Sequence, residues 1–365
     1  MHRINLIKIL TLLLLMVTIS ANAQHDASKE VHGDSSNEDK DIRTEIKEYI
    51  AHHLLDSYDF TLFSWTTDAG EHKYFSAPLP VILWDGGLKV FSSSKFNHGE
   101  TLAEVDGNYY KLYHSKIYKT DAAGTINYDE EHHATNVKPL DFSITKNVVF
   151  IMFVAVLMLF IFIRMAKSYQ NNALPKGIGR LLEPLIVYIR DDVAIPNIGE
   201  KHYRKYMSYL LTVFFFVWII NLLGLTPLGV NVTNNIAVTF ALALITYLLT
   251  TFTANKNYWK HIFWMPGVPT LMKIILAPIE LLGTFIKPFS LMIRLYANIT
   301  AGHIVLMSII GLMFIFKSWI GSPLSFGLSF ALALLELLVA ALQAYIFTML
   351  SALYFGMAVE EHDEH

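Results

Sequence analysis

Long apolar runs separated by short charged segments dominate the C-terminal part of the chain. Five such runs span residues 147–164, 206–225, 236–253, 269–316 and 324–359. Each approaches or exceeds the roughly 20 apolar residues with which an α-helix crosses the hydrocarbon core of a bilayer. We therefore expect an all-α membrane domain over residues 142–365, with about five membrane helices.

The last two runs are too long for helices that cross the bilayer at right angles. At 1.5 Å per residue, a helix of about 45 residues would be roughly 65 Å long, about twice the hydrocarbon thickness. Pro278 and Pro288 lie inside the first of these runs and offer bend points. The pattern predicts two long helices that tilt steeply, bend or break.

The beginning of the chain has the pattern of a secretory signal. Arg3 and Lys8 precede an apolar core, and the small residues at positions 21–23 fit a cleavage site. We expect residues 1–23 to be a signal peptide, with an uncleaved membrane helix as the alternative. Residues 24–57 should form a polar tail that ends in a short amphipathic helix.

Residues 58–141 differ from the rest because apolar and polar positions alternate over short stretches. The sequences VILW and LKVFSS flank Asp85-Gly86-Gly87, which is typical of a β-hairpin. The sequence YYKLYHSKIYK at residues 109–119 predicts one further strand. We expect a small β-rich insert that lies outside the cytoplasm.

The composition agrees with an integral membrane protein. Hydrophobic residues make up 53% of the chain and charged residues only 16%, whereas soluble domains average about 25% charged residues. The net charge of −3 argues against a nucleic-acid-binding protein. The chain has no cysteine, and its adjacent histidines at 52–53 and 132–133 lack the spacing of metal ligands. We therefore expect neither a metal ion nor a cofactor.

Basic residues are concentrated between the first and second apolar runs. By the positive-inside rule this segment is cytoplasmic, which places the N-terminal region outside and the C-terminus inside. Within it, apolar residues at 178–189 recur on one face, as in a helix on the membrane surface. We expect residues 254–264 to form an interfacial loop on the same side. The basic residues are Arg164, Lys167, Lys176, Arg180, Arg190, Lys201, Arg204 and Lys205.

A permanent charge lies in the middle of the fourth run. Arg294 keeps its proton at any physiological pH, and a charge at mid-bilayer costs roughly 3 kcal/mol or more unless it is compensated. Residues 281–335 contain no Asp or Glu. The charge partner of Arg294 must therefore come from elsewhere in the chain or from another chain.

Five further polar residues lie in the last two runs: Glu280, Asn298, His303, Glu336 and Gln343. On an ideal helix, at about 100° per residue, Asn298 shares a face with Arg294, whereas His303 lies about 180° away. This arrangement suits a proton path divided by the arginine, because Glu and His can be tuned to titrate near neutral pH. Helix packing is the alternative role for lone amides, including Asn221 and Asn231 beside the loop after the second run.

The sequence SLMIRLYANITAGH around Arg294 resembles the signature of subunit a of F-type ATP synthases. Tyr296 and Ala297 replace the usual Phe and Gly of that signature. The resemblance covers about residues 46–57 and 147 to the end, without the insert. The positions that match are Arg294, Leu295, Asn298, Ala301 and Gly302.

The resemblance implies a multi-pass stator subunit in a bacterial inner membrane, whose last two helices are steeply tilted around a rotor ring. Arg294 would be the essential residue, which meets the carboxylate of subunit c in the ring. His303 and Glu336 would line the outer half-channel, and Gln343 would lie near Arg294. Glu280 and Asn298 would complete the proton pathway.

The same resemblance implies the partners of the chain. These would be the c-ring, the peripheral-stalk subunit b and the rest of the F1Fo complex. The translocated ion would be H⁺, with Na⁺ as the alternative. The resemblance does not cover the insert, whose role is left open between a contact with another stator subunit and a cap over the channel mouth. The chain would carry out no ATP chemistry itself, and its sequence has no phosphate-binding loop.

Two other classes of membrane protein also place charges inside the bilayer. An ion-coupled secondary transporter is the first alternative, but such proteins typically contain repeated halves with broken helices, and no internal repeat is visible. An intramembrane protease is the second alternative. The H-E-x-x-H motif of the metal-dependent class is absent, and no Ser-His or paired-Asp arrangement stands out.

Overall fold

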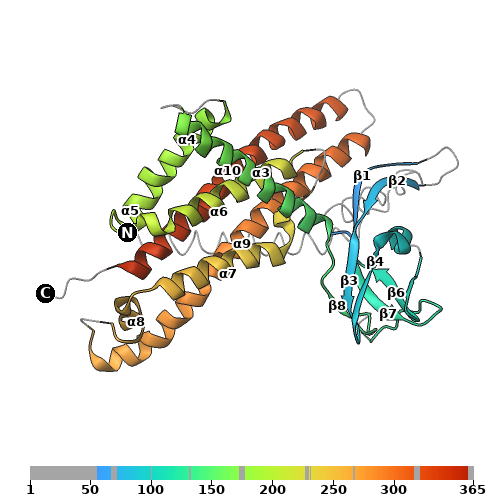
Figure 1. Ribbon diagram of the computed structural model, residues 1–365, viewed down its shortest axis with the longest axis horizontal. Coiled ribbons are helices and arrows are strands. Elements are labelled where there is room, and N and C mark those ends of the chain that lie inside the picture. The colour runs from blue at the N-terminus through green and yellow to red at the C-terminus, as the bar shows by residue number, and fades with distance from the viewer. Residues whose placement is uncertain are drawn as a thin grey trace, which may run out of the picture. The chain divides into compact units, whose positions relative to one another are not determined.

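The computed structural model describes residues 56–66, 72–99, 101–130, 133–171, 177–226, 230, 232–265, 268–315 and 321–360. The signal peptide expected at residues 1–23 lies outside the described residues. So does nearly all of the tail and amphipathic helix expected at residues 24–57. In the described chain, strands occupy the part up to residue 141 and long helices the part from residue 146 (Figure 1).

The insert consists of antiparallel strands, which confirms the β-containing region expected from the alternating pattern. Three small sheets form in the orders β1-β2, β4-β3-β8 and β5-β6-β7. A 3₁₀ helix, Ser93–Gly99, links β4 to β5. The strands are β1 (Asp59–Thr66), β2 (His72–Pro78), β3 (Pro80–Trp84), β4 (Leu88–Ser92), β5 (Ala103–Val105), β6 (Asn108–Tyr113), β7 (Lys116–Thr120) and β8 (Leu140–Asp141).

In two hairpins, the turn residues determine which strands pair. The hairpin expected around Asp85-Gly86-Gly87 is confirmed, since β3 pairs with β4 as far as Trp84 opposite Leu88. The single strand expected at residues 109–119 is wrong, because this segment is a second hairpin between β6 and β7. His114 and Ser115 have φ values of 46° and 57°, and two consecutive positive φ angles make the two-residue turn that closes a tight hairpin.

The insert has its own apolar core and is tied to the first membrane helix, α3 (Lys146–Asn171). The Tyr58 hydroxyl donates a hydrogen bond to the carboxylate of Asp141 at the other end of the insert. The Lys146 amide donates to the Ser57 carbonyl at 2.9 Å. The two ends of the insert therefore meet at the start of α3. The core residues are Tyr58, Val81, Leu83, Phe91, Phe96, Ala103, Tyr110 and Ile117.

Five helices of the described chain are long and apolar enough to cross a membrane, as expected from the five apolar runs. They are α3, α6 (Tyr203–Gly224), α7 (Ile236–Thr253), α9 (Thr270–Ile315) and α10 (Gly321–Val359). The stretch between α3 and α6 forms α4 (Ile178–Tyr188), a π-helical turn (Ile189–Ala194) and α5 (Ile195–Ile198). A single 3₁₀ turn, Val232–Asn234, precedes α7.

The loop expected at residues 254–264 is wrong, because it contains the helix α8 (Lys256–Phe263). Lys256 and Lys260 lie one turn apart, while Ile262 is buried. Side chains one turn apart share a face of a helix, so α8 is amphipathic. Eight residues are too few for this periodicity to stand out in the sequence.

The last two helices are unusually long, with 46 residues in α9 and 39 in α10. At 1.5 Å per residue they span about 69 Å and about 58 Å. Helix α9 continues through Pro278 and Pro288 without a break. The break considered from the sequence is therefore wrong. Figure 1 shows α9 and α10 running side by side, and α6 packs against α10.

Small residues let these helices approach closely, as is usual for helices in membranes. On α10, Ala340 and Ala344 are buried, and on α9 the buried residues include Leu291 and Leu295. Helix α10 also approaches α5 at Gly356, where an added Cβ atom would overlap the carbonyl group of Asn197. These close approaches fix the positions of the polar side chains on α9 and α10.

Candidate functional site

Arg294 lies in the middle of α9, on a partly exposed face next to buried Leu295. Among the described residues, no carboxylate forms an ion pair with its guanidinium group. The Tyr354 side chain of α10 lies close enough to Arg294 for an electrostatic interaction. Within the described chain, Arg294 thus presents a charge without a counter-ion.

One turn further along α9, Asn298 reaches the neighbouring helix. Its Nδ2 atom donates a hydrogen bond to Oε1 of Gln343 on α10 at 2.9 Å. Asn298 is exposed, whereas Gln343 is only 1% exposed. The structure therefore places these two amides together, beside Arg294.

His303 and Glu336 form the second cross-helix pair. His303 Nδ1 lies 3.9 Å from Glu336 Oε1, and their side chains are 5% and 8% exposed. Gly302 packs against this pair, since a Cβ atom there would be in ordinary van der Waals contact with Glu336 Oε1, 3.4 Å away. This separation of the pair exceeds the roughly 2.6–3.2 Å of a direct proton transfer, so the imidazole and the carboxylate exchange a proton only after closer approach or through a bridging water.

A small cavity adjoins this pair, in which a water-sized sphere has about 10 Å³ of room. That is about the space that one water molecule needs. The cavity is lined by His303, Glu336, Ile299, Ala340 and, from the end of α6 and the residue after it, Asn221, Gly224 and Leu225. Glu336 Oε2 and Asn221 Nδ2 are buried and have no hydrogen-bond partner within the described part of the chain. Groups of this kind are usually satisfied by water, which suits a proton path.

Hydroxyl and amide groups extend this polar region toward the turn before α7. The Thr233 hydroxyl donates to Asn221 Oδ1 at 2.8 Å, and the Thr300 hydroxyl bonds to Asn234 Oδ1. The sequence did not single out Thr233, Asn234 or Thr300. Asn221, for which helix packing was the simpler interpretation, both makes a helix-packing hydrogen bond and lines the cavity.

A second polar cavity lies on the other side of Arg294, between α8, α9 and the end of α10. It has a volume of about 180 Å³, and its lining includes Glu280, Thr284 and Lys287 of α9 and His261 of α8. A narrower space of about 20 Å³ shares Thr284 and Lys287 with it and reaches Tyr354, the residue that interacts with Arg294. This second cavity therefore approaches Arg294 from the opposite side.

Two more side chains define the chemistry of this second cavity. Lys287 lies over the Tyr354 ring, with Nζ 5.9 Å from the ring centroid. Burial raises the pKa of the Tyr258 hydroxyl on α8, and the charge of Glu280 adds to the effect, so this phenol stays neutral. Lys287 was missed in the sequence, although a lysine inside an apolar run is itself a signal of function.

The two cavities share no lining residue. Along α9, Arg294 is six residues from Pro288, which lines the narrower space, and five from Ile299. These separations correspond to about 9 Å and about 7.5 Å of helix. The arrangement is therefore two polar spaces separated by a permanent cation.

The site contains no cluster suited to a metal. Among the residues that the structure describes, no group of three or more His, Asp or Glu side chains is placed to hold a metal ion. The polar groups of both cavities are proton donors and acceptors, and the arrangement suits proton transfer.

Comparison with known proteins identifies relatives for both parts of the chain. The family described as ATP synthase A chain matches residues 148–356. A domain of unknown function matches residues 49–142, which covers the insert. The two matches meet at the junction between the strands and α3.

Curated relatives agree with the first of these matches. ATP synthase subunit a of Chloroherpeton thalassium is 44% identical over 233 residues, which cover 62% of this chain and 69% of the relative. ATP synthase subunit a of Myxococcus xanthus is 41% identical over 235 residues, covering 62% and 77%. ATP synthase subunit a 2 of Prosthecochloris aestuarii is 37% identical over 310 residues, covering 80% and 94%. The last alignment is longer than the membrane domain alone and therefore includes part of the insert.

Proposed function

The chain belongs to the family of ATP synthase A chains, and on this basis we propose that it is the membrane stator subunit a of an F-type ATP synthase. In this proposal it provides two proton half-channels that meet a rotating ring of c subunits at Arg294. The observation that carries the proposal is the pair of separate polar cavities on either side of an arginine without a counter-ion in the described chain. Proton flow through the half-channels then drives rotation and ATP synthesis.

Arg294 separates the half-channels because it carries charge but passes no proton. Its guanidinium group does not deprotonate in proteins. A carboxylate on the facing ring would be stabilised in its ionised form by this cation and would release its proton on arrival. The free energy comes from the membrane potential, about 2.3 kcal/mol per charge per 100 mV.

The two cavities would serve as the half-channels. His303, Glu336 and Asn221 would form the outer one, and Glu280, with Thr284 of the second cavity, the inner one. Asn298 and Gln343, joined by a hydrogen bond beside Arg294, would hold the two long helices in register at the point of contact with the ring. Acidic and imidazole side chains are suited to accept and pass on protons at each step.

Charge along the chain supports one orientation in the bacterial inner membrane. Basic residues begin in the last turns of α3, at Arg164 and Lys167, and continue to Lys205 in the first turn of α6. By the positive-inside rule this segment is cytoplasmic. The insert and the preceding residues would then be periplasmic, and the C-terminus after α10 would be cytoplasmic.

The proposed partners follow from the same role. The chain would contact the c-ring through α9 and α10, and the peripheral-stalk subunit b and the rest of the F1Fo complex would hold it stationary. ATP chemistry would take place on other subunits. The proposed ion is H⁺.

Proton pumping in inverted membrane vesicles tests the role of Arg294. In the Arg294→Ala variant, we expect that ATP hydrolysis no longer acidifies the vesicle interior, which a pH-sensitive dye reports. A native gel should show that the complex is still assembled. Gly327→Ala is a matched control, because Gly327 lies on α10 with no atom within 4 Å of an added Cβ. Normal pumping by an assembled Arg294→Ala complex would contradict the proposal and favour an ion-coupled transporter.

Accessibility from each side tests the half-channels separately. The chain has no native cysteine, so single cysteines can be introduced without a background. We expect Thr284→Cys to react with Ag⁺ only from the cytoplasmic side and Asn221→Cys only from the periplasmic side. Reaction of both positions from one side would contradict two separate half-channels.

A further inference from the structure

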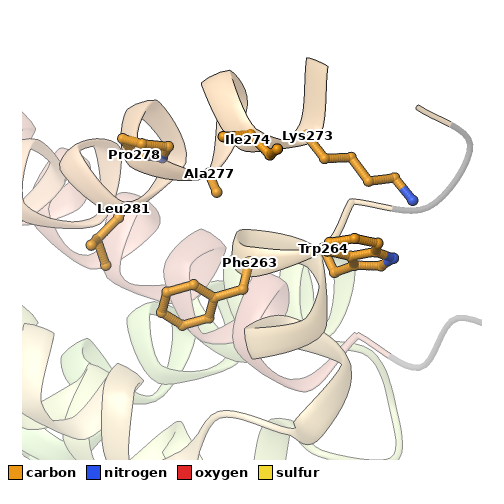
Figure 2. A pocket seen from close by; sticks show the side chains of 7 residues that line it. All are labelled: Phe263, Trp264, Lys273, Ile274, Ala277, Pro278 and Leu281. Atoms are coloured by element: carbon orange, nitrogen blue, oxygen red, sulfur yellow. The ribbon is translucent and has the colours of Figure 1, made fainter. Parts of the chain in front are cut away.

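An open groove lies between α8 and the first turns of α9, and it shares no lining residue with the cavities around Arg294. Its volume is about 400 Å³. Phe263 and Trp264, at the end of α8, form one wall (Figure 2). The opposite wall is the face of α9 that carries Ile274, Ala277, Pro278 and Leu281.

The groove exists because of the residue sizes on this face of α9. Positions 274, 277, 278 and 281 recur at the three- and four-residue spacing of one helix face. Ala277 in the middle of that face has only a methyl group, so no large side chain fills the space opposite Phe263. The result is an apolar slot that follows the helix axis.

The two ends of the slot differ in polarity. Lys273 at one end is the single charged residue of the lining, and its Nζ atom lies 4.6 Å from the centroid of the Trp264 ring. No carboxylate of the described chain forms an ion pair with Lys273. Leu281 at the other end is apolar. Eight residues of α9 separate the ends, which is about 12 Å.

The surface around the slot belongs to the membrane-facing part of the protein. Leu271, Ile275 and Leu282 are 78%, 60% and 60% exposed, and all lie within a candidate membrane span that begins at Thr270. Trp and Lys at the end of such a span are typical of the membrane–water interface. The slot therefore has its charged end at the level of lipid headgroups and its apolar end deeper in the bilayer.

We propose that this groove binds one phospholipid with an anionic headgroup. The phosphate lies at Lys273 beside the Trp264 indole, and one acyl chain lies along Ile274, Ala277 and Leu281. The positive charge of the Lys273 ammonium group complements the anionic headgroup, and the apolar slot complements the acyl chain of the lipid.

Native mass spectrometry of the assembled complex, extracted from membranes that contain phosphatidylglycerol, tests the headgroup. We expect Lys273→Gln to lower the amount of retained phosphatidylglycerol about fivefold, the change that follows when one interfacial Lys no longer attracts an anionic lipid. Lys167→Gln is the matched control, because it removes the same charge from the exposed end of α3. Equal retention by the wild type and Lys273→Gln, or an equal loss with Lys167→Gln, would overturn the proposal.

A second variant tests the slot itself. Ala277→Phe fills the groove while leaving Lys273 in place, and we expect it to expel phosphatidylglycerol with ATP-driven pumping retained. Exchange of phosphatidylglycerol for phosphatidylcholine in the wild type should lower the retained lipid similarly to Lys273→Gln. Equal retention of both lipids would overturn the anionic preference.

Cross-linking identifies the occupant directly. A photoreactive benzoyl-phenylalanine in place of Phe263 should attach to lipid in intact membranes. Attachment to another protein subunit instead of lipid would overturn the proposal.

Discussion

At the scale of single residues, the facing imidazole and carboxylate of His303 and Glu336 are buried and 3.9 Å apart. A carboxylate and an imidazole can attract each other when charged, whereas two carboxylates or two imidazolium groups at this distance would repel each other.

Exchange of the two groups tests this pairing. We expect His303→Glu alone and Glu336→His alone each to lower the rate of proton pumping by tenfold or more, on the order of 1.4 kcal/mol in the barrier. The double exchange should recover most of the rate, because it restores one imidazole facing one carboxylate. Dye-monitored pumping in inverted vesicles gives the rates. A double variant no better than the single ones would show that the two positions act independently.

The insert carries a second residue-scale interaction, which responds to pH. The Asp85 carboxylate accepts hydrogen bonds from Lys119 at 2.7 Å and from the Tyr110 hydroxyl at 3.0 Å. The bond from Lys119 lowers the pKa of Asp85. A lowered pKa contributes stability at pH values above the unfolded pKa of about 3.9, and this stability is lost as the pH falls through the folded pKa.

Asp85→Asn should therefore destabilise the insert at pH 7 but not below the folded pKa of Asp85. The expected loss is about 0.5 kcal/mol, because the Lys119 side chain is 36% exposed and solvent screens the pair. Urea unfolding of the full chain in detergent, followed by tryptophan fluorescence at pH 7 and pH 3, measures the difference. Asp106→Asn, which removes the much more exposed carboxylate of the pair with Lys89, is the control and should change little. A constant loss at both pH values would contradict the ion-pair explanation.

At the scale of elements, the contact between α5 and α10 depends on the absence of a side chain at Gly356. An added Cβ atom there would overlap the backbone carbonyl of Asn197. Backbone cannot move aside as the end of a flexible side chain can, so the two helices would have to separate.

We expect Gly356→Ala to destabilise the chain by about 2 kcal/mol, as overpacking in a closely packed interior does. Gly327→Ala, on the same helix with open space around it, should be neutral or stabilising by up to about 1 kcal/mol. Thermal unfolding of the detergent-solubilised chain compares the two. Similar melting temperatures for both variants would mean that α5 does not pack tightly on α10.

Most of the membrane helices could be predicted from the sequence, because long apolar runs identify such helices by length alone. The residues around Arg294 stood out because charges and amides are rare in such runs. Features that depend on contact between distant segments could not be predicted. The separation of His303 from Glu336, the cavity shared with Asn221 and the role of Thr233 depend on how α6, α9 and α10 pack. The turn at His114 and Ser115 was hidden because the two-residue hairpin signals are Asn-Gly, Asp-Gly and Gly-Gly, and His-Ser is none of these.

At the scale of the whole molecule, the membrane helices line the cavities around Arg294 and the insert does not. The cavities on both sides of Arg294 are lined only by residues from Asn221 onward. The insert meets the helices through its two ends, where the Lys146 amide bonds to the Ser57 carbonyl and the Asn147 amide bonds to the Asp56 carboxylate at 3.3 Å.

Replacement of residues 59–140 by a short Gly-Ser linker should therefore leave ATP-driven proton pumping within about twofold of the wild type. The linker keeps Tyr58 and Asp141, whose side chains are hydrogen-bonded in the intact chain. Pumping is measured per assembled complex, so that a lower yield is not mistaken for a slower rate. A much slower pump in fully assembled complexes would show that the insert takes part in the proton path.

The meeting of the two ends of the insert has a consequence for the history of this gene. A segment that leaves and rejoins the fold at one point can be gained, lost or exchanged in a single recombination event without moving a membrane helix. The two family matches, which end at residue 142 and begin at residue 148, fall on either side of that point. The same junction is a site at which a fluorescent protein or an affinity tag can be grafted without moving a membrane helix.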